Sequence, residues 1–376
     1  MIIPEAPISD FAAALDDVPQ SALERGRDFA EQIARNMISD FKRDGDFMVH
    51  VSSYVVMNGM IYVTYYANRD TAAEDPHYHT ARFVFCRADN PDEKTYIDVQ
   101  RAGDTWNGKS VDALYDTILM RNGSRLFIEW TAMLSGNYYR LYRVFDTETG
   151  ELSDIRANML KIGDTVVEFN IADMKKAFEA HGIGYKNMYS DIGIMQKLSY
   201  RDETDGMGNT VRYYYSGAYC GDCNFIIKSR DLAVWEYVSQ PDFLNQSQWE
   251  NAVYVIDERC FYFVRQRGSE YGFLTAYNLD DGTWDKPVLI PDCQSRSDFI
   301  MHDGGLYLFH APIDRNHIGV VKICRDELAR SEIVMQADMG ESCFYPFIDY
   351  GDDGRLYFSY TSDRRHIKLS RFEWRL

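Results

Sequence analysis

Residues 250–279 read ENAVYVIDERCFYFVRQRGSEYGFLTAYNL, three short runs rich in aromatic and β-branched residues. Such residues favour strands because flat and branched side chains pack well on a pleated surface. Short polar stretches, which are typical of turns, separate the runs. This stretch therefore predicts three consecutive antiparallel strands.

The same pattern recurs along the chain from about residue 50. Its middle, aromatic strand begins at a glycine or polar residue six times, at Gly59, Ser124, Thr210, Arg259, Gly305 and Gly354. The last four begin about 46 to 49 residues apart, which lies within the period of propeller blades. The sequence thus predicts an all-β fold, a six-bladed β-propeller.

Each middle strand has an apolar strand before it and another after it. Hairpin turns are indicated by Asn58-Gly59, Asn122-Gly123 and Asp353-Gly354. A fourth, outer strand follows in five units, for example KTYIDVQ at 94–100, but the last unit ends with the chain. We expect FMVHVS, residues 47–52, to supply that outer strand and close the ring, which removes exposed sheet edges.

Two segments lie outside the repeat. Residues 10–42 place apolar side chains at roughly helical spacing, and residues 170–184 predict a short helix ended by Gly182 and Gly184. We therefore divide the chain into an N-terminal helical extension, residues 1–45, packed on a single propeller domain, residues 46–376.

Composition limits the class of partner. The net charge of −18 repels phosphate backbones, so nucleic acid is not an expected partner. Seven scattered cysteines favour reduced thiols, and with no signal peptide or membrane-spanning run visible we expect a cytoplasmic location. No phosphate-binding glycine motif occurs, and Cys220 and Cys223 have no second cysteine pair, so we expect neither cofactor nor metal.

Polar side chains gather where the first strand of a blade begins and the second ends, because these positions share one rim. All six units contribute, in chain order: Ser52, Ser53, Asn68, Arg69, Asp70, Asp112, Asp116, Glu129, Trp130, Asp191, Tyr215, Tyr219, Glu250, Arg265, Gln266, Arg267, Gln294, Arg296, Asp298, His310, Asp314, Arg315, Tyr345, Tyr360, Asp363 and Arg364. Carboxylates, arginines and aromatic rings in one concave site suit a sugar or glycan ligand.

Four stretches carry a resemblance to a known family. In residues 248–268 a glutamate opens a strand and an arginine ends the next, and in residues 342–360 a tyrosine opens the inner strand. Residues 278–284 (NLDDGTW) and 229–235 (SRDLAVW) are similar to the Asp-box turn. Together they resemble the sialidase (neuraminidase) superfamily of six-bladed glycoside hydrolases, from about residue 189 onward. SRDLAVW also looks like a turn of five-bladed furanosidases.

The resemblance implies roles for individual residues. Tyr345 would be the nucleophile and Glu250 its general base. The acid/base group would be a carboxylate of the first-blade loop, for which we take Asp75 while Asp70 and Glu74 remain open. The arginines that clamp a substrate carboxylate would include two residues, Arg265 and Arg296. The first-blade arginine of the family is missing, because residues 50–56 read HVSSYVV and Arg69 lies later.

Further polar residues extend the predicted binding site. We expect six of them to contact the substrate, namely Arg69, Gln266, Asp298, His310, Arg315 and Arg364. The polar residues at 294–298 and 310–317 are denser than in the sialidase pattern, which indicates a uronic-acid- or deoxysugar-containing oligosaccharide. Asp191 opens the third inner strand and is a second candidate acid opposite Glu250, as in hydrolases with two carboxylates.

Three functions remain open from the sequence. The first is an exo-acting glycosidase that trims a small oligosaccharide. The second is a lyase that abstracts a proton next to a uronate carboxyl while arginines neutralise the acid. The third is a non-catalytic glycan-binding propeller.

Overall fold

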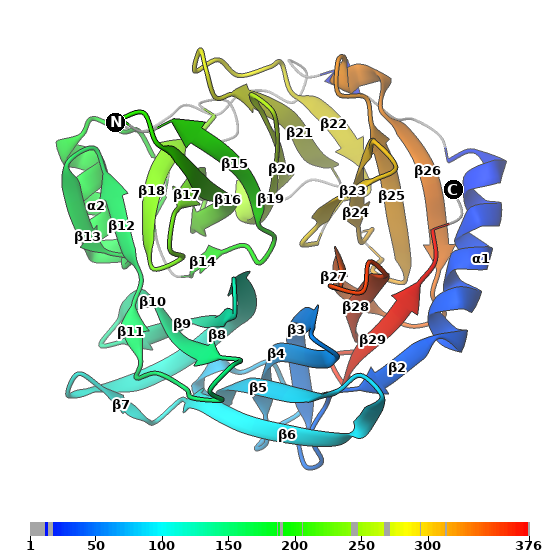
Figure 1. Cartoon of the computed structure of the whole chain (residues 1–376), viewed down its shortest axis with the longest axis horizontal. Coiled ribbons are helices and arrows are strands. Elements are labelled where there is room, and N and C mark those ends of the chain that lie inside the picture. The colour runs from blue at the N-terminus through cyan, green and yellow to red at the C-terminus, as the bar shows by residue number, and fades with distance from the viewer. Residues whose placement is uncertain are drawn as a thin grey trace.

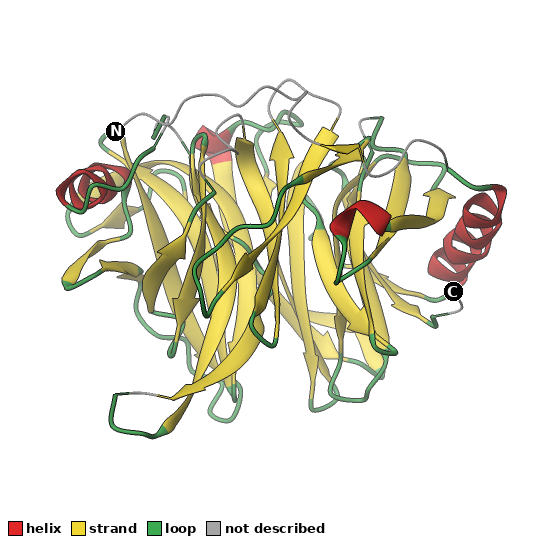
Figure 2. Cartoon of the chain, turned by 90° about the horizontal axis from the view of Figure 1, so that it is seen from above, coloured by secondary structure: helices red, strands yellow, loops and turns green. Residues whose placement is uncertain are grey.

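The computed structural model describes residues 12–13, 18–185, 187–188, 191–204, 206–241, 247–266, 271–293, 295–312 and 314–374. In this part of the chain, six β-sheets lie around a central axis (Figure 1). Seen from the side, their strands run roughly along that axis (Figure 2). The prediction of a mainly-β propeller with an N-terminal helix is confirmed, and each repeat unit contributes one sheet.

The first three sheets follow one another along the chain. The first contains β3 (Met48–Met57), β4 (Met60–Asn68), β5 (His79–Arg87) and β6 (Asn90–Arg101). The second contains β7 (Thr105–Trp106), β8 (Lys109–Asn122), β9 (Arg125–Leu134), β10 (Asn137–Asp146) and β11 (Arg156–Ala157). The third contains β12 (Met159–Ile162), β13 (Thr165–Glu168), β14 (Ile192–Ile194), β15 (Ser199–Thr204), β16 (Thr210–Cys220), β17 (Cys223–Ser229) and β18 (Val234–Ser239).

The remaining sheets complete the ring. The fourth contains β1 (Ala12–Ala13), β19 (Ser247–Ile256), β20 (Arg259–Gln266), β21 (Tyr271–Asn278) and β22 (Val288–Pro291). The fifth contains β23 (Asp298–His302), β24 (Gly305–His310), β25 (His317–Ile323) and β26 (Glu332–Asp338). The sixth contains β2 (Met37–Asp40), β27 (Cys343–Tyr350), β28 (Leu356–Ser362) and β29 (His366–Phe372). The helices are α1 (Gln20–Arg35), α2 (Ile171–Ala180) and the short 3₁₀ turns η2 (Pro76–Tyr78) and η3 (Leu328–Arg330).

The strand that completes the sixth sheet is not the predicted one. Residues 47–52 were expected as its outer strand, but 48–52 begin β3, the inner strand of the first sheet. The outer strand is β2, which pairs antiparallel with β29 through partners such as Asp40 and Lys368. The predicted helix over 10–42 is correspondingly shorter, since β2 lies within that range. The sheet therefore crosses the expected domain boundary at residue 45.

Helix α1 covers the outside of the ring beside β26 (Figure 1). Its buried side chains include Phe29 and Ile33, which pack among residues of the fifth and sixth sheets. Gly26 permits this close approach, because a Cβ there would lie 1.8 Å from the carbonyl oxygen of Gln336. The helix is thus part of the core between these two sheets.

Among the residues that the structure describes, six clusters of buried apolar side chains fill the spaces between successive sheets. The cluster around Val49, Tyr54 and Phe347 joins the first sheet to the sixth, so the ring is closed by packing as well as by β2. Burial of apolar surface of this kind is the main source of stability in such folds.

Replacing Phe29 by alanine should lower the free energy of unfolding by about 3–5 kcal/mol, because it leaves a cavity between three aromatic rings. Phe29 is 2 % exposed and contacts Phe309, Phe358 and Phe372, with ring centroids 6.3, 5.2 and 5.0 Å away. Urea unfolding measures the change, and Leu23→Ala on the exposed face of the same helix is the control. Equal midpoints for the two variants would contradict this role of α1.

The cysteines are free thiols, and six of the seven are buried. Cys220 and Cys223 face each other across a tight hairpin turn between β16 and β17. The described residues contain no group of three or more His, Cys, Asp and Glu side chains that could hold a metal ion. They also contain no helix with the length and apolar character needed to cross a membrane.

Candidate active site

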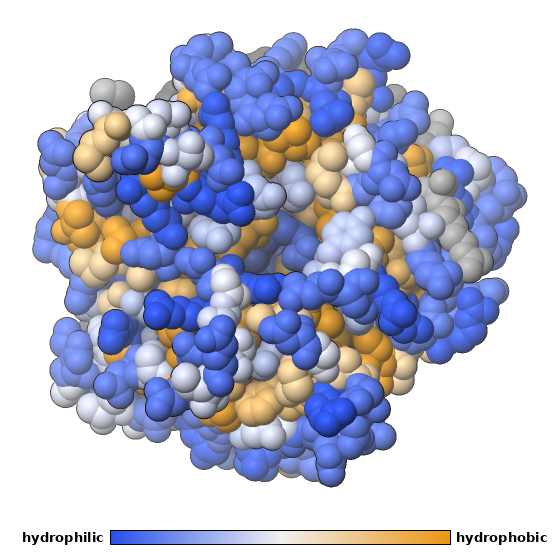
Figure 3. Space-filling model, in the orientation of Figure 1, coloured by the Kyte–Doolittle hydropathy of each residue, from blue (hydrophilic) through white to orange (hydrophobic). Residues whose placement is uncertain are grey.

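A cavity of about 250 Å³ lies inside the ring, lined by residues of five sheets and by Arg296, which lies just before β23 of the fifth. It is lined by Val51, Tyr66, Glu74, Pro76, His79, Tyr115, Asp116, Asp191, Tyr219, Glu250, Arg296 and Tyr345. Figure 3 shows one face of the ring, largely hydrophilic and hollowed at its centre.

Irregular backbone places several of these side chains. The inner strands of the first, second, fourth and sixth sheets each lose regular register at the cavity, next to Val51, Asp116, Glu250 and Tyr345. Val51, Asp116 and Tyr345 have φ values of 57°, 47° and 54°, and Asp191 has 76°. Bulges redirect side chains, and non-glycine residues with positive φ are costly, so their concentration around one cavity points to a functional site.

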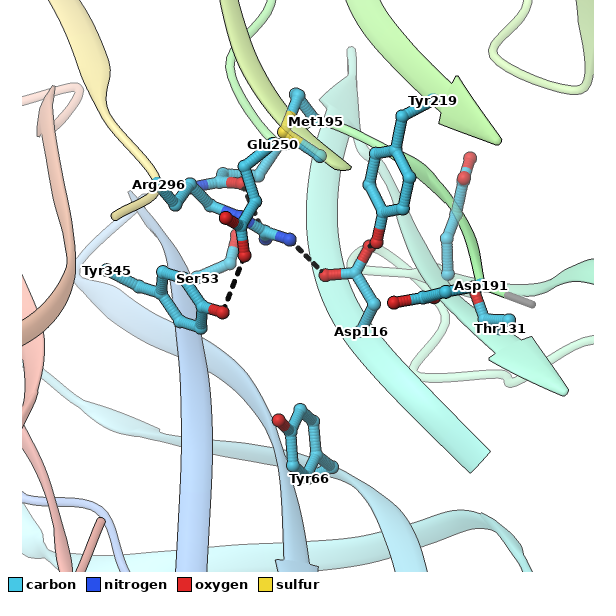
Figure 4. A network of polar contacts seen from close by, with 12 residues as sticks. Ser53, Tyr66, Asp116, Thr131, Asp191, Met195, Tyr219, Glu250, Arg296 and Tyr345 are labelled. Carbon is cyan, nitrogen blue, oxygen red and sulfur yellow. Dashed lines mark hydrogen bonds and ion pairs between the residues drawn. The ribbon is translucent and has the colours of Figure 1, made fainter. Parts of the chain in front are cut away.

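Tyr345 and Glu250 form a hydrogen-bonded pair across two sheets. The Tyr345 hydroxyl donates to Glu250 Oε1 at 2.6 Å (Figure 4). Arg265 donates to Glu250 Oε2 at 2.6 Å. Burial raises the pKa of Glu250, but the charges of Arg265 and Arg296 outweigh burial and hold this pKa below its ordinary value. Burial, followed by the Glu250 charge, raises the pKa of Tyr345 well above 10. The phenol is therefore protonated, with an ionised carboxylate ready to accept its proton.

Arg296 and Asp116 form a second ion pair, between the fifth and second sheets (Figure 4). The Arg296 guanidinium also donates to Gln196 Oε1 at 3.1 Å and lies 4.9 Å from the centre of the Tyr345 ring. The Tyr219 hydroxyl donates to the other oxygen of Asp116 at 3.2 Å. Arg296 is 2 % exposed and Asp116 4 %, so this pair is part of the cavity wall.

Arg140 fixes Asp116 from behind. It donates to the carbonyl oxygen of Asp116 and to Thr131 Oγ1, both at 3.0 Å, and lies 3.5 Å from Glu129. Burial raises the pKa of Glu129 to about 7. The left-handed conformation of Asp116 is thus held by contacts on both sides of the strand.

Asp191 lies across the cavity from Tyr345 (Figure 4). It precedes β14, and one carboxylate oxygen accepts a hydrogen bond from the Ile192 amide at 2.9 Å. Burial, with repulsion from Asp116 and Glu250, raises the pKa of Asp191 to about 8. Asp191 is therefore mostly protonated at neutral pH and can donate a proton inside the cavity.

Two neutral histidines support the wall. The His50 ring stacks on Tyr345 with centroids 4.5 Å apart, and burial lowers the pKa of His50 well below 6.5. His79 stacks on Tyr66, and its Nδ1 lies 2.7 Å from the carbonyl oxygen of Leu114. A carbonyl only accepts hydrogen bonds, so Nδ1 carries the proton. The buried Nε2 of His79 has no hydrogen-bond partner and is left as an acceptor at the cavity.

The residues between β14 and β15 close the cavity on the side away from its mouth. Lys197 reaches from the third sheet across the ring to the carbonyl oxygen of Ile348 in the sixth sheet, and lies 3.3 Å from Asp298. Next to it, Gln196 binds Arg296 and lines a second cavity of about 210 Å³. That cavity is bordered by later residues of the inner strands, such as Tyr54 and Tyr350, so it lies further from the mouth. The site is therefore a pocket with a floor.

The structure brings together four of the residues singled out from the sequence, Tyr345, Glu250, Asp191 and Arg296, with Arg265 behind Glu250. Arg364 does not line the cavity, but it pairs with Glu74 at 2.5 Å beside it. Arg364 and Arg315 both lie over the Phe344 ring, at 5.0 and 5.1 Å. The side chain of Gln266 lies outside the described residues.

The first-blade prediction needs a correction. Asp75 does not line the cavity, because its carboxylate accepts a hydrogen bond from the His77 amide at 3.1 Å and begins η2. Glu74 lines it instead, and it accepts a hydrogen bond from Tyr66 at 2.5 Å. Asp70 is exposed in the turn after β4.

Three other predicted contacts lie elsewhere. Arg69 turns to Asp46, 3.5 Å away. Asp298 binds Lys197 and accepts a hydrogen bond from the Ile348 amide at 3.0 Å, so it holds the floor together. His310 is buried within the fifth sheet beside Gly319.

Two described stretches similar to Asp-boxes form turns. In residues 229–235, Asp231 accepts hydrogen bonds from the amides of Ala233 and Val234, both at 2.9 Å, and Trp235 is fully buried. In residues 278–284, Asn278 and Asp281 accept amide hydrogen bonds in the same manner. Both turns connect outer strands, away from the cavity.

Comparison with known proteins gives a fold relationship. No protein-family model matches the sequence, and no curated protein is similar to it in sequence. Among solved structures, the K499G mutant of NanB sialidase from Streptococcus pneumoniae matches at 10 % identity and a TM-score of 0.50, over 90 % of this chain and 70 % of that chain. A NanB complex with 2-[(3-chlorobenzyl)ammonio]ethanesulfonate matches at 10 % identity and a TM-score of 0.51. The match covers 89 % of this chain and 70 % of that chain.

A GH43_1 enzyme from Xanthomonas citri complexed with xylotriose matches at 11 % identity and a TM-score of 0.45, over 93 % of each chain. The NanB matches make the chain distantly similar in fold to a sialidase. At these identities the similarity extends to the fold alone.

Proposed function

We propose that this protein is a glycoside hydrolase that removes one sugar at a time from the end of an oligosaccharide. The observation that carries the proposal is the part-buried, hydrogen-bonded Tyr345–Glu250 pair facing the Asp191 carboxyl, whose pKa is raised to about 8. The floored pocket of about 250 Å³ is small for a ligand site and supports an exo-acting enzyme over one that binds long chains.

The chemistry proceeds in two steps. The Tyr345 oxygen attacks the anomeric carbon while its proton passes to Glu250, and Asp191 protonates the departing glycosidic oxygen. A water molecule then attacks the same carbon and gives a proton to the Asp191 carboxylate, while Tyr345 leaves and regains its proton from Glu250. Two displacements at one carbon retain the anomeric configuration.

The lyase and binding alternatives receive less support. A lyase needs an arginine free to neutralise a uronate carboxyl, whereas Arg265 and Arg296 are each paired with a carboxylate. A pure binding site has no need of a protonated carboxyl opposite a tyrosine–glutamate pair. Incubation with a panel of oligosaccharides should release reducing sugar without an unsaturated, ultraviolet-absorbing product. Release of the unsaturated product would contradict hydrolysis. So would the absence of both products.

Turnover should fall as pH rises through about 8. Asp191 must carry a proton to act as the acid, and its pKa lies near 8 because of burial and the neighbouring carboxylates. Glu250 must be ionised, and because its pKa lies below the ordinary 4.5, activity should persist into moderately acidic solution. The measurement is kcat/KM against pH on an oligosaccharide that the enzyme cleaves. A maximum above pH 9 would contradict Asp191 as the acid.

A further inference from the structure

We infer that the pocket accepts an electrically neutral sugar, and that Asp116 sets this preference by occupying the arginine that would otherwise bind a sugar carboxylate. The inference rests on the proposed function, which it makes more specific. It selects neutral sugars over acidic ones, two classes that the sequence left open.

Three arginines at or beside the pocket are paired with carboxylates. Arg296 contacts Asp116, Arg265 donates to Glu250 at 2.6 Å, and Arg364 lies 2.5 Å from Glu74. Each of these three arginines thus contacts a carboxylate. A sugar carboxylate that approached any of the three would meet an anion already bound there, and like charges at close range are strongly unfavourable.

Further hydrogen bonds hold Asp116 in its ion pair with Arg296. Its second oxygen accepts a hydrogen bond from Tyr219 at 3.2 Å, and its backbone carbonyl accepts one from Arg140 at 3.0 Å. Arg296 is held equally firmly, by Gln196 and by the Tyr345 ring. A sugar carboxylate could bind Arg296 only by displacing Asp116. That would leave the buried Asp116 charge uncompensated, which is strongly unfavourable.

The rest of the wall suits hydroxyl groups and apolar sugar faces. The unpartnered Nε2 of His79 can accept a hydrogen bond from a hydroxyl, and the Asp191 carboxyl can donate one. Val51, Pro76 and Tyr66 add apolar surface to the same wall. These groups match a neutral sugar ring, and the match is lost if the ring carries a charge.

The test compares neutral methyl glycosides with the matching uronic acid methyl glycosides in the gluco, galacto and manno series. Calorimetric titration of the wild-type protein should show the best neutral sugar binding at least about tenfold more tightly than its uronic acid. In Asp116→Asn, which frees Arg296, that ratio should fall at least about tenfold. Asp352→Asn is the matched control, because it removes a carboxylate 2.5 Å from Arg121 at an exposed site and should leave the ratio unchanged. Melting temperatures confirm that both variants fold.

Tighter binding of the acids by the wild-type protein, or an unchanged ratio in Asp116→Asn, would overturn the inference. Turnover of the aryl glycosides of the same sugars tests the proposed hydrolase activity separately from the preference for neutral sugars. Cleavage of uronides but not of neutral glycosides would overturn the neutral preference and leave a hydrolase. Selective binding of neutral sugars without cleavage of any substrate would leave the preference and contradict the hydrolase. If nothing binds and nothing is cleaved, both fail.

Discussion

Replacing Tyr345 by phenylalanine should reduce kcat/KM by about 10³-fold or more, because the variant has no oxygen to attack the anomeric carbon. The six-membered aromatic ring is retained, so its stacking on His50 and its contact with the Arg296 guanidinium should persist. Binding of a neutral sugar should change little. The measurement is the rate at which reducing sugar is released from one oligosaccharide that the wild-type enzyme cleaves.

The chain provides a close control for this variant. Tyr360 lies on β28 of the same sheet, and its hydroxyl also donates to a glutamate, Glu341, at 2.6 Å. It does not line the cavity, so Tyr360→Phe should retain turnover. Equal loss of activity in the two variants would show that Tyr345→Phe acts through the sheet, and full activity in Tyr345→Phe would exclude Tyr345 as the nucleophile.

Replacing Asp191 by asparagine should reduce kcat on an unactivated oligosaccharide by about 10²–10⁴-fold, the usual contribution of a general acid. A dinitrophenyl glycoside has a leaving group that departs without protonation, so its first step should be nearly unaffected. The alkaline loss of activity near pH 8 should disappear in the variant. If the initial burst of dinitrophenol were slowed as much as oligosaccharide turnover, and the alkaline limb were retained, the assignment would be contradicted.

The same substitution should not destabilise the protein at pH 7. The pKa of Asp191 is about 8 in the folded chain against an ordinary 3.8, so the unfolded chain releases this proton first as pH rises. Stability therefore falls as pH rises from about 3.8 to about 8, and asparagine removes that dependence. Asp298→Asn is the control, because burial also raises the pKa of Asp298, to about 7, away from the cavity. It should weaken the floor around Lys197 without changing how turnover depends on pH.

The repeat was predictable because each sheet is built mainly from neighbouring strands joined by tight turns. Alternating aromatic and apolar runs around Gly59 or Gly354 specify such strands locally. The strand β2 could not be found in this way. It has four residues, and its partner β29 lies more than 300 residues away, so its pairing depends on closure of the ring and not on local pattern.

The candidate site was predictable to a similar extent. Tyr345, Glu250 and Asp191 stand where inner strands begin, which the sequence marks by a polar residue before an apolar run. Asp116 lies inside such a run, and only the bulge of β8 turns it into the cavity. Its place on the rim was visible, but its pairing with Arg296 depends on a left-handed backbone that no residue pattern specified.

The sequence contains a signal against choosing Asp75 over Glu74 for the cavity. Asp75 is followed by Pro76, and an aspartate before a proline is a common start of a helical turn. That preference engages the Asp75 carboxylate locally and leaves Glu74 for the cavity. Asp298 gave no such signal, because its partner Lys197 comes from the irregular segment that interrupts the third inner strand.

The central claim is that Tyr345 forms a bond to the sugar, and the most direct test is to trap that bond. Asp191→Asn lacks the group that activates water in the second step, so dinitrophenyl glycosides of neutral monosaccharides should leave their sugar on the protein. Mass spectrometry of the digested protein should find one sugar residue on the peptide that carries Tyr345. Release of dinitrophenol with no adduct, or an adduct on Asp116 or Glu250, would contradict the mechanism.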